Sequence, residues 1–217
     1  SLRLALEALG RENVLAVIMP YKTGNPNSEK DARELCEKFN VTYEVHSITP
    51  MADAYFATDT NINAARKGNV MARLRMVILY DLSARNSALV LGTSNRTETL
   101  LGYATMWGDM ACALNPLGNL FKYQVYSLAQ YFGVTEAILK KAPSADLWTG
   151  QSDEGELGFT YAIADLVLYY YSEKKYSRAQ LENLVVEHGE DAGVVEKILS
   201  RIEKFAYKRS MPPIVPL

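Results

Sequence analysis

The sequence has little of what a disulfide-rich, metal-binding or membrane-spanning protein needs. It contains two cysteines, Cys36 and Cys112, and two histidines, among 217 residues. Two cysteines cannot build a disulfide framework, and neither has a second Cys or a His at metal-ligand spacing. No apolar run approaches the ~20 residues of a membrane helix, and no basic and apolar leader opens the chain. These absences predict a protein of a reducing compartment, the cytoplasm, with no membrane partner.

An excess of one charge is also missing. The formal net charge is −2 and the isoelectric point is near 5.8, so the sequence lacks the basic excess that general nucleic-acid binding requires. We therefore expect no nucleic-acid partner, and any anionic ligand should be small. His46 stands alone in an expected strand and His188 precedes a glycine, and neither is near a Ser or Cys nucleophile motif. A hydrolase built on a Ser-His-Asp triad is not expected.

Hydrophobic residues make up 48% of the chain, enough for a sizeable core. Their spacing predicts strands over residues 13–20, 41–48 and 87–92, and helices over residues 2–9, 28–39 and 63–86. Ser28, followed by Asp31, is expected to cap the helix 28–39, whose apolar stripe places Cys36 in the core. This order predicts an α/β fold, a doubly wound parallel sheet with helices on both faces, which binds ligands at the carboxyl ends of its strands.

The second half of the chain is expected to be mainly helical. Helical periodicity covers residues 121–133, 134–141, 161–171, 177–189 and 191–210. Residues 142–158 are expected to form a loop, and a loop of that length is usually functional or mobile. The predicted doubly wound sheet is therefore followed by a helical C-terminal portion.

A burst of polar residues, GTSNRTE at residues 92–98, follows the third expected strand. There the Thr93 hydroxyl could meet a phosphate or a ribose, and the Glu98 carboxylate, in the first turns of the next helix, could hold Mg²⁺. The same residues fit a structural role, in which Thr93 caps the helix and Glu98 complements its N-terminal dipole. The pattern alone does not decide between these two interpretations.

The basic residues present a similar choice. Arg73 and Arg75 lie two positions apart on one helix, so at most one of them points toward a strand-end site, and a solvated position is the default. Lys122 stands at a helix start, where the dipole disfavours a cation, and a phosphate partner would explain it. Lys208 and Arg209 end the last helix, where the dipole alone is sufficient to explain them.

Four blocks of the sequence, in order and with matching spacing, resemble the NAD synthetases, members of the N-type ATP pyrophosphatase, adenine-nucleotide alpha-hydrolase-like group. They are RKGNVMARLRMVILYD, GTSNRTETLLGYATMWGDM, ALNPLGNLFKYQVYSLAQYFGV and KAPSADLWTGQSDEGELGF, within roughly residues 66 to 160. The resemblance implies a carbon-nitrogen ligase that converts deamido-NAD, ATP and ammonia into NAD, AMP and pyrophosphate through an acyl-adenylate. Such chemistry needs positioned cations and hydroxyls, so no catalytic nucleophile is expected.

The resemblance also assigns site residues by position. It places Thr93, Lys122 and Ser144 on ATP, Glu98 on Mg²⁺, and Arg73 and Lys208 on deamido-NAD. It further implies a homodimer with active sites near the interface, for which the apolar segment 76–80 is a candidate contact surface.

The chain departs from the family pattern at two places. The Ser-Gly-Gly-x-Asp-Ser loop, which wraps pyrophosphate, is absent and by spacing should lie just before Ser1. We therefore expect a single domain over residues 1–217 that lacks its N-terminal strand and phosphate loop. Met106 and Ala113 replace a Lys and an Asp that bind substrate in many members, and those two roles are not carried over.

Two alternatives stay open. One is another ATP-pyrophosphatase-type amidating enzyme, such as the synthetase domain for GMP, in which a purine replaces deamido-NAD. The other is a non-catalytic nucleotide-binding or dimerisation module that has lost the phosphate loop. Assays with each acceptor test the first alternative, and the intact N-terminal sequence tests the second.

Overall fold

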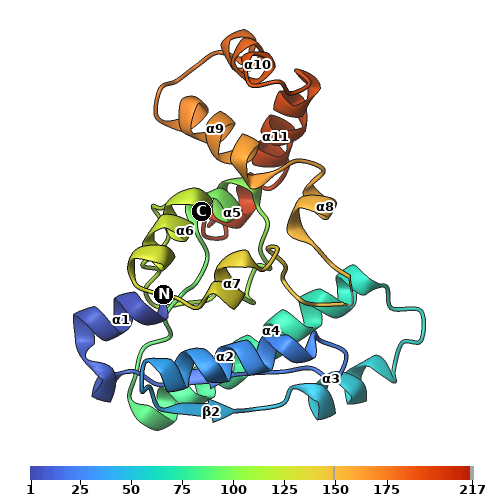
Figure 1. Cartoon of the computed structure of the whole chain (residues 1–217). Helices are drawn as coiled ribbons and strands as arrows, with labels where there is room; N and C mark the ends of the chain where they lie inside the picture. The colour runs from blue at the N-terminus through green and yellow to red at the C-terminus, as the bar shows by residue number, and fades with distance from the viewer. Residues whose placement is uncertain (149, 216–217) are drawn as a thin grey trace.

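The computed structural model describes residues 1–148 and 150–215, and helices dominate it (Figure 1). The elements are α1 Leu2–Leu9, η1 Arg11–Asn13, β1 Ala16–Ile18, α2 Pro26–Lys38, β2 Tyr43–Val45, α3 Thr49–Phe56, α4 Ala64–Asn86, α5 Arg96–Leu101, α6 Lys122–Tyr131, α7 Glu136–Lys140, α8 Asp153–Leu157, α9 Tyr161–Ser172, α10 Arg178–Glu187, α11 Gly193–Lys204 and η2 Ala206–Arg209. The protein is a mostly helical α/β structure with a parallel sheet. In Figure 1, α9, α10 and α11 lie at one end of the molecule, and β2, α2 and α4 at the other.

The sheet is smaller than the sequence predicts. Within the described residues β1 and β2 form a two-stranded parallel sheet. The third expected strand, residues 87–92, is not formed as a strand and contributes one parallel bridge, from Leu91 to Leu114. Beside that bridge the Gly92 amide donates to the Leu114 carbonyl at 2.7 Å. Residues 90–92 thus find their backbone partner in residues 113–114, and not in β1 or β2.

Two expected boundaries are wrong for local reasons. Helix α2 starts at Pro26 because Asn25 is its N-cap, the side chain accepting from the Asn27 amide at 3.0 Å. Ser28 therefore lies inside the helix, where its hydroxyl accepts from Lys141 Nζ at 2.8 Å. The expected loop 142–158 contains the short helix α8, and α3 was not predicted.

Two hydrophobic clusters hold the elements together. The larger joins α5 to α9, α10 and α11, and its fully buried members include Leu101, Leu168, Leu181 and Ile198. Each such side chain contributes roughly 1.5–3 kcal/mol when it is fully buried. The smaller cluster is centred on Ile48, Ala52 and Met71, beside α3 and α4. The first cluster fixes α9 against α5, and this packing positions the polar groups described below.

A glycine lets the end of the chain close over α5. Gly102 is the C-cap of α5 with φ +62°, and a Cβ atom there would lie 2.2 Å from the Cβ of Phe205. Just after Phe205, Lys208 Nζ donates to the Gly102 carbonyl at 2.9 Å and Arg209 donates to the Leu100 carbonyl at 2.9 Å. Arg209 also donates to the Ile202 carbonyl, in the last turn of α11, at 2.8 Å, so these cations complement the dipole of α5 as well as that of the helix they follow.

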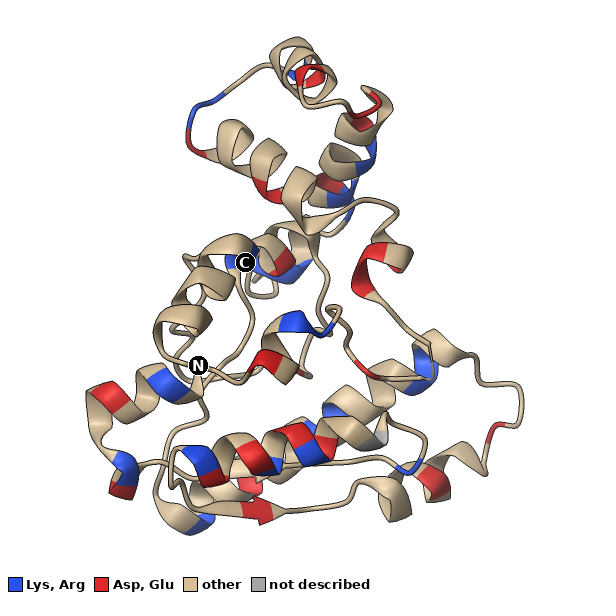
Figure 2. Cartoon of the chain, viewed as in Figure 1, with Lys and Arg blue, Asp and Glu red and all other residues tan. Residues whose placement is uncertain are grey.

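Acidic and basic residues are interspersed along the surface helices, as on α2 (Figure 2). Arg33 and Glu29, one turn apart on α2, form an ion pair at 2.7 Å. Cys36, on the same helix, is buried as predicted. In the part of the chain that the structure describes, no helix combines the length and apolarity needed to cross a membrane.

Candidate functional site

The polar burst at residues 92–98 forms the start of α5, and Asn95 is its N-cap. The Asn95 side chain accepts from the Glu98 amide at 2.9 Å, and Glu98 Oε2 accepts from the Asn95 amide at 3.1 Å, which completes a capping box. Thr93 is exposed and lies before the helix. The capping role is therefore wrong for Thr93, and the helix-start role is confirmed for Glu98 through one of its oxygens.

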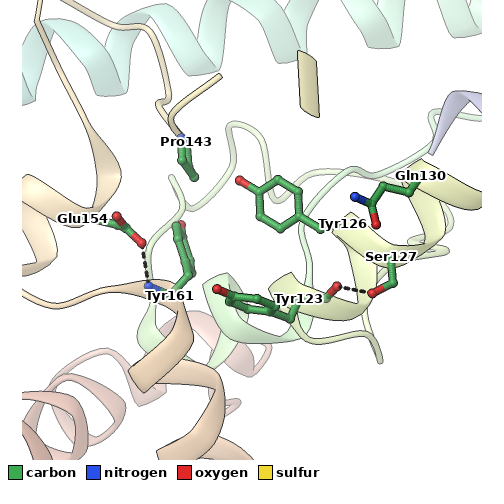
Figure 3. A pocket seen from close by; sticks show the side chains of 7 residues that line it. All are labelled: Tyr123, Tyr126, Ser127, Gln130, Pro143, Glu154 and Tyr161. Atoms are coloured by element: carbon green, nitrogen blue, oxygen red, sulfur yellow. Dashed lines mark hydrogen bonds between the residues drawn. The ribbon is translucent and has the colours of Figure 1, made fainter. Parts of the chain in front are cut away.

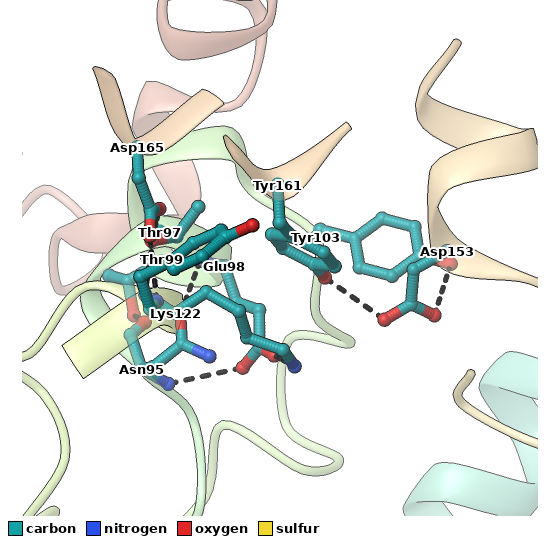
Figure 4. Close-up of polar contacts among 10 residues, drawn as sticks. Asn95, Thr97, Glu98, Thr99, Tyr103, Lys122, Asp153, Tyr161 and Asp165 are labelled. Carbon is teal, nitrogen blue, oxygen red and sulfur yellow. Dashed lines mark hydrogen bonds and ion pairs between the residues drawn. The ribbon is translucent and has the colours of Figure 1, made fainter. Parts of the chain in front are cut away.

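The other oxygen of Glu98 contacts Lys122, the first residue of α6. Lys122 Nζ lies 2.8 Å from Glu98 Oε1, and each side chain is 17% exposed (Figure 4). The ammonium also lies 4.7 Å from the ring centroid of Tyr161. Burial lowers the pKa of Lys122, but the Glu98 carboxylate, together with Asp153 and Tyr126, more than offsets this and the net pKa is raised. The structure thus brings two of the predicted site residues together, with the lysine held as a cation.

A buried polar network holds the backbone at Lys122. The Lys122 amide donates to Thr97 Oγ1 at 3.0 Å, and the Thr97 hydroxyl donates in turn to Asp165 on α9. The Tyr123 amide donates to Asp165 Oδ2 at 2.8 Å. Burial raises the pKa of Asp165, and the hydrogen bonds from Thr97 and Tyr123 oppose that rise. A carboxylate at this helix N-terminus complements the dipole that Lys122 opposes.

Sequence reasoning missed Asp165 as a site residue. The available signal is one acid within the apolar helix YAIADLVLYYY, because an Asp is rarely buried unless it is partnered.

A second acid, Asp153 of α8, binds two tyrosines beside the ion pair. Tyr161 donates to Asp153 Oδ2 at 2.9 Å, and Tyr103 donates to Asp153 Oδ1 at 3.2 Å (Figure 4). Burial raises the pKa of both phenols, so they remain protonated donors. Asp153, which sequence reasoning also missed, thus ties the segment 142–158 to the site.

A cavity of about 360 Å³ opens beside this network (Figure 3). Its lining residues are Tyr123, Tyr126, Ser127, Gln130, Pro143, Glu154 and Tyr161. The predicted ATP residue Ser144 directly follows Pro143, and its hydroxyl accepts from the Asp146 amide at 3.0 Å. The cavity therefore lies between α6 and the segment that contains Ser144.

The two arginines of α4 diverge, as their spacing predicts. Arg75 is half-buried, and its Nε donates to the Met19 carbonyl, just after β1, at 3.0 Å. Arg73 is exposed, and its Nε donates to the Met106 carbonyl at 3.2 Å. Arg75, and not the predicted substrate residue Arg73, therefore points to the carboxyl end of β1.

Arg73 and Lys208, both predicted to bind deamido-NAD, meet at one turn. Lys208 Nζ donates to the Ala104 carbonyl at 2.7 Å, two residues before the Met106 carbonyl that Arg73 contacts. Burial lowers the pKa of Lys208, and the positive charge of Arg73 adds to this effect. Four of the six predicted residues thus form two groups, Glu98 and Lys122 at the starts of α5 and α6, and Arg73 and Lys208 at residues 104–106.

Possible metal ligands are sparse. Among the described residues, no three His, Cys, Asp or Glu side chains gather closely enough to hold a metal ion. Glu98 stands as a single carboxylate, which fits a cation that takes most of its ligands from water and a bound phosphate.

Comparison with known proteins decides the family. The NAD synthase family matches residues 2–212. The chain belongs to the NAD synthase family. The NH(3)-dependent NAD(+) synthetase of Chlorobaculum tepidum is 46% identical over 214 residues, which make up 99% of this chain and 76% of that protein. The resemblance seen in the four sequence blocks is thus confirmed.

Two solved structures share this fold. The NMN synthetase from Francisella tularensis has a TM-score of 0.81 and 34% identity, covering 94% of this chain and 79% of that one. The NH3-dependent NAD synthetase from Campylobacter jejuni has a TM-score of 0.77 and 32% identity, covering 98% of this chain and 82% of that one.

Proposed function

We propose that this chain is a ligase that converts deamido-NAD, ATP and ammonia into NAD, AMP and pyrophosphate through an acyl-adenylate. The observation that carries the proposal is family membership over residues 2–212. The Chlorobaculum tepidum relative, 46% identical, is an NH(3)-dependent NAD(+) synthetase. Family membership favours NAD synthesis over amidation of a purine and over a module without catalysis.

ATP is proposed to bind at the starts of α5 and α6, where it would contact Lys122, Thr93 and Ser144. Lys122 supplies a cation beside a cavity, and the two hydroxyls supply hydrogen bonds to phosphate oxygens. Glu98 is the residue proposed to hold Mg²⁺, which when bound neutralises developing charge on the phosphates. Supporting this role, the Glu98 carboxylate already binds a cation, the Lys122 ammonium.

The nicotinate-bearing substrate is proposed to bind near residues 104–106, at Arg73 and Lys208. Arg73 is exposed and retains N–H donors beyond its contact with the Met106 carbonyl. The Lys208 ammonium has three N–H donors, and the carbonyls of Gly102 and Ala104 accept two bonds from it. Both side chains therefore keep a donor for a carboxylate or a phosphate of the substrate.

A coupled assay tests the proposed function. Purified protein is given ATP, Mg²⁺, ammonium and deamido-NAD, and NAD and pyrophosphate are quantified. We expect both products in equal amounts and neither when deamido-NAD is omitted. Pyrophosphate release that does not depend on deamido-NAD would refute the proposal, and amidation of a purine nucleotide instead would favour the GMP synthetase alternative.

A second candidate acceptor is the mononucleotide of nicotinate. Two observations favour it: the TM-score of 0.81 to an NMN synthetase, and the apolar residues Met106 and Ala113 at positions where many members place charged substrate ligands. A smaller acceptor needs fewer such ligands. Comparing kcat/KM for the dinucleotide and the mononucleotide decides between them, and the larger value identifies the physiological acceptor.

A homodimer is proposed through the outer face of α4. Val77 is 54% exposed and Tyr80 is 42% exposed, and both lie on the helical face that carries Arg73. An interface there would bring the partner close to the proposed substrate residues. Light scattering should give a dimer mass, and Val77→Glu should convert it to a monomer; a monomeric native protein would contradict the proposal.

We also propose that the β1–β2 pair and the Leu91–Leu114 bridge belong to one doubly wound sheet within a single domain. Both pairings are parallel, which supports this arrangement. The free thiols of Cys36 and Cys112 support a cytoplasmic location. A structure determined with ATP bound tests the sheet directly.

A further inference from the structure

We infer that Asp165 is a positioning residue for the ATP-binding lysine: its buried carboxylate on α9 fixes the first turn of α6 and thereby aims the Lys122 ammonium. The inference rests on the proposed function, because it takes Lys122 to be the group that meets ATP.

One carboxylate holds the first two amides of α6. Asp165 Oδ2 accepts directly from the Tyr123 amide at 2.8 Å. Its Oδ1 accepts from the Thr97 hydroxyl, whose oxygen in turn accepts from the Lys122 amide at 3.0 Å. Asp165 is 9% exposed and Thr97 is fully buried, so neither bond is easily replaced by solvent. Movement of this carboxylate would therefore move the backbone of Lys122.

The source of this cap is unusual for a helix start. Position 121, the N-cap of α6, is a Phe that provides no side-chain cap, although Ser, Thr, Asp and Asn are preferred there. The capping carboxylate comes instead from α9, 42 positions away from Tyr123 in the sequence. A Ser or Asp at position 121 could accept from the Tyr123 amide without linking α6 to α9. The remote cap thus adds a fixed relationship between these helices.

Helix α9 contacts Lys122 at both ends of the lysine side chain. Asp165 holds its backbone through Thr97, and Tyr161, one turn earlier on α9, has its ring centroid 4.7 Å from Lys122 Nζ. The ammonium then reaches Glu98 at 2.8 Å. The direction of the side chain is therefore set by α9 before ATP arrives, and such preorganisation lowers the cost of binding.

The first test is Asp165→Asn, which keeps the side-chain volume but removes the charge and one acceptor. We expect the KM for ATP to rise roughly tenfold while the KM for the nicotinate acceptor changes by less than about twofold. The matched control is Asp191→Asn, which removes the carboxylate that accepts from the Gly193 amide, at 2.7 Å, before α11. If Asp165 only stabilised the fold, the KM for ATP would be unchanged in both Asp165→Asn and Asp191→Asn. That result would overturn the inference.

A double-mutant cycle with Lys122→Met shows whether Asp165 acts through the lysine. Affinity for ATP is measured at equilibrium by calorimetry. Asp165→Asn should cost roughly tenfold in the native background and less than about twofold beside Lys122→Met. An equal cost in both backgrounds would refute the inference while leaving the ATP role of Lys122 intact. Unchanged affinity in Lys122→Met alone would instead refute the proposed ATP site.

Thr97→Val provides a second route if Asp165→Asn does not fold. It removes the hydroxyl that links Lys122 to Asp165 and leaves the Tyr123 bond in place. The same rise in the KM for ATP, together with the same loss of effect beside Lys122→Met, is expected. A folded Thr97→Val protein with an unchanged KM for ATP would overturn the inference.

Discussion

Lys122 Nζ and Glu98 Oε1 lie 2.8 Å apart, although both residues stand in the first turns of their helices, α6 and α5. The dipole of α5 favours Glu98, whereas that of α6 disfavours Lys122. The lysine is held there by the two carboxylates of Glu98 and Asp165, which offset its unfavourable position. A phosphate bound at this point would meet a cation that has been placed in advance.

Replacing Lys122 by Met should remove that cation. We expect kcat/KM for ATP to fall about 10²–10³-fold, the usual loss when one positioned charge on the reacting group is deleted. The free energy of unfolding should fall by about 1–2 kcal/mol, between the values for exposed and buried ion pairs. Steady-state kinetics and urea unfolding measure these effects. An unchanged kcat/KM for ATP would contradict the assignment of Lys122.

Glu98→Gln should separate chemistry from helix capping. A Gln oxygen can still accept from the Asn95 amide, so the capping box survives, and the stability loss, about 1–2 kcal/mol, should come from the lost ion pair with Lys122. Adenylation, measured as Mg²⁺-dependent pyrophosphate release, should be abolished because the charge partner of the cation is lost.

Asn95→Ala is the matched control for Glu98→Gln. It removes the N-cap of α5, at a cost of about 1 kcal/mol, while the charge of Glu98 remains. We expect a less stable protein that retains Mg²⁺-dependent pyrophosphate release per folded molecule. Undiminished release in Glu98→Gln would count against the magnesium role.

The two arginines of α4 should respond differently to Ala. Arg73 is exposed, so Arg73→Ala should change stability by less than about 0.5 kcal/mol while raising the KM for the nicotinate acceptor more than that for ATP. Arg75 is half-buried on the Met19 carbonyl, so Arg75→Ala should mainly lower the melting temperature. Thermal unfolding and acceptor titration measure both, and a rise in the KM for ATP alone in Arg73→Ala would contradict the prediction.

Local patterns predicted the long helices and placed two residues of the site, Glu98 and Lys122, at helix starts. Helical periodicity located α4, α6, α9, α10 and α11, and the polar burst correctly placed Glu98 at the start of α5. The choice of Asn95 over Thr93 as cap was not predictable, because GTSN offers several residues able to cap and the backbone decides among them. Residues 87–92 failed as a strand because strand pairing depends on distant segments.

The polar network was also beyond local patterns. The bond between Tyr123 and Asp165 joins residues 42 positions apart, and no local spacing encodes it. The available signal was the single acid in the apolar sequence of α9, because a buried carboxyl needs hydrogen-bond donors nearby. Lys122 at a helix start was anomalous in the sequence because the two carboxylates that compensate it, Glu98 and Asp165, lie on other helices.

Stability in the acid range should report the burial of Asp165. Burial raises the pKa of this carboxyl above its ordinary value of 3.8, so ionising it costs more in the folded chain than in the unfolded one. Its contribution to the free energy of unfolding is therefore fully present below about pH 3.8 and is lost as the pH rises through the folded pKa. Asp165→Asn does not titrate, so the stability of the native protein relative to the variant should decrease over that window, by about 1.4 kcal/mol for each pKa unit of difference. Urea unfolding of both proteins across the acid range measures this difference, and a relative stability that increases with pH would show that the carboxyl is not buried as the structure has it.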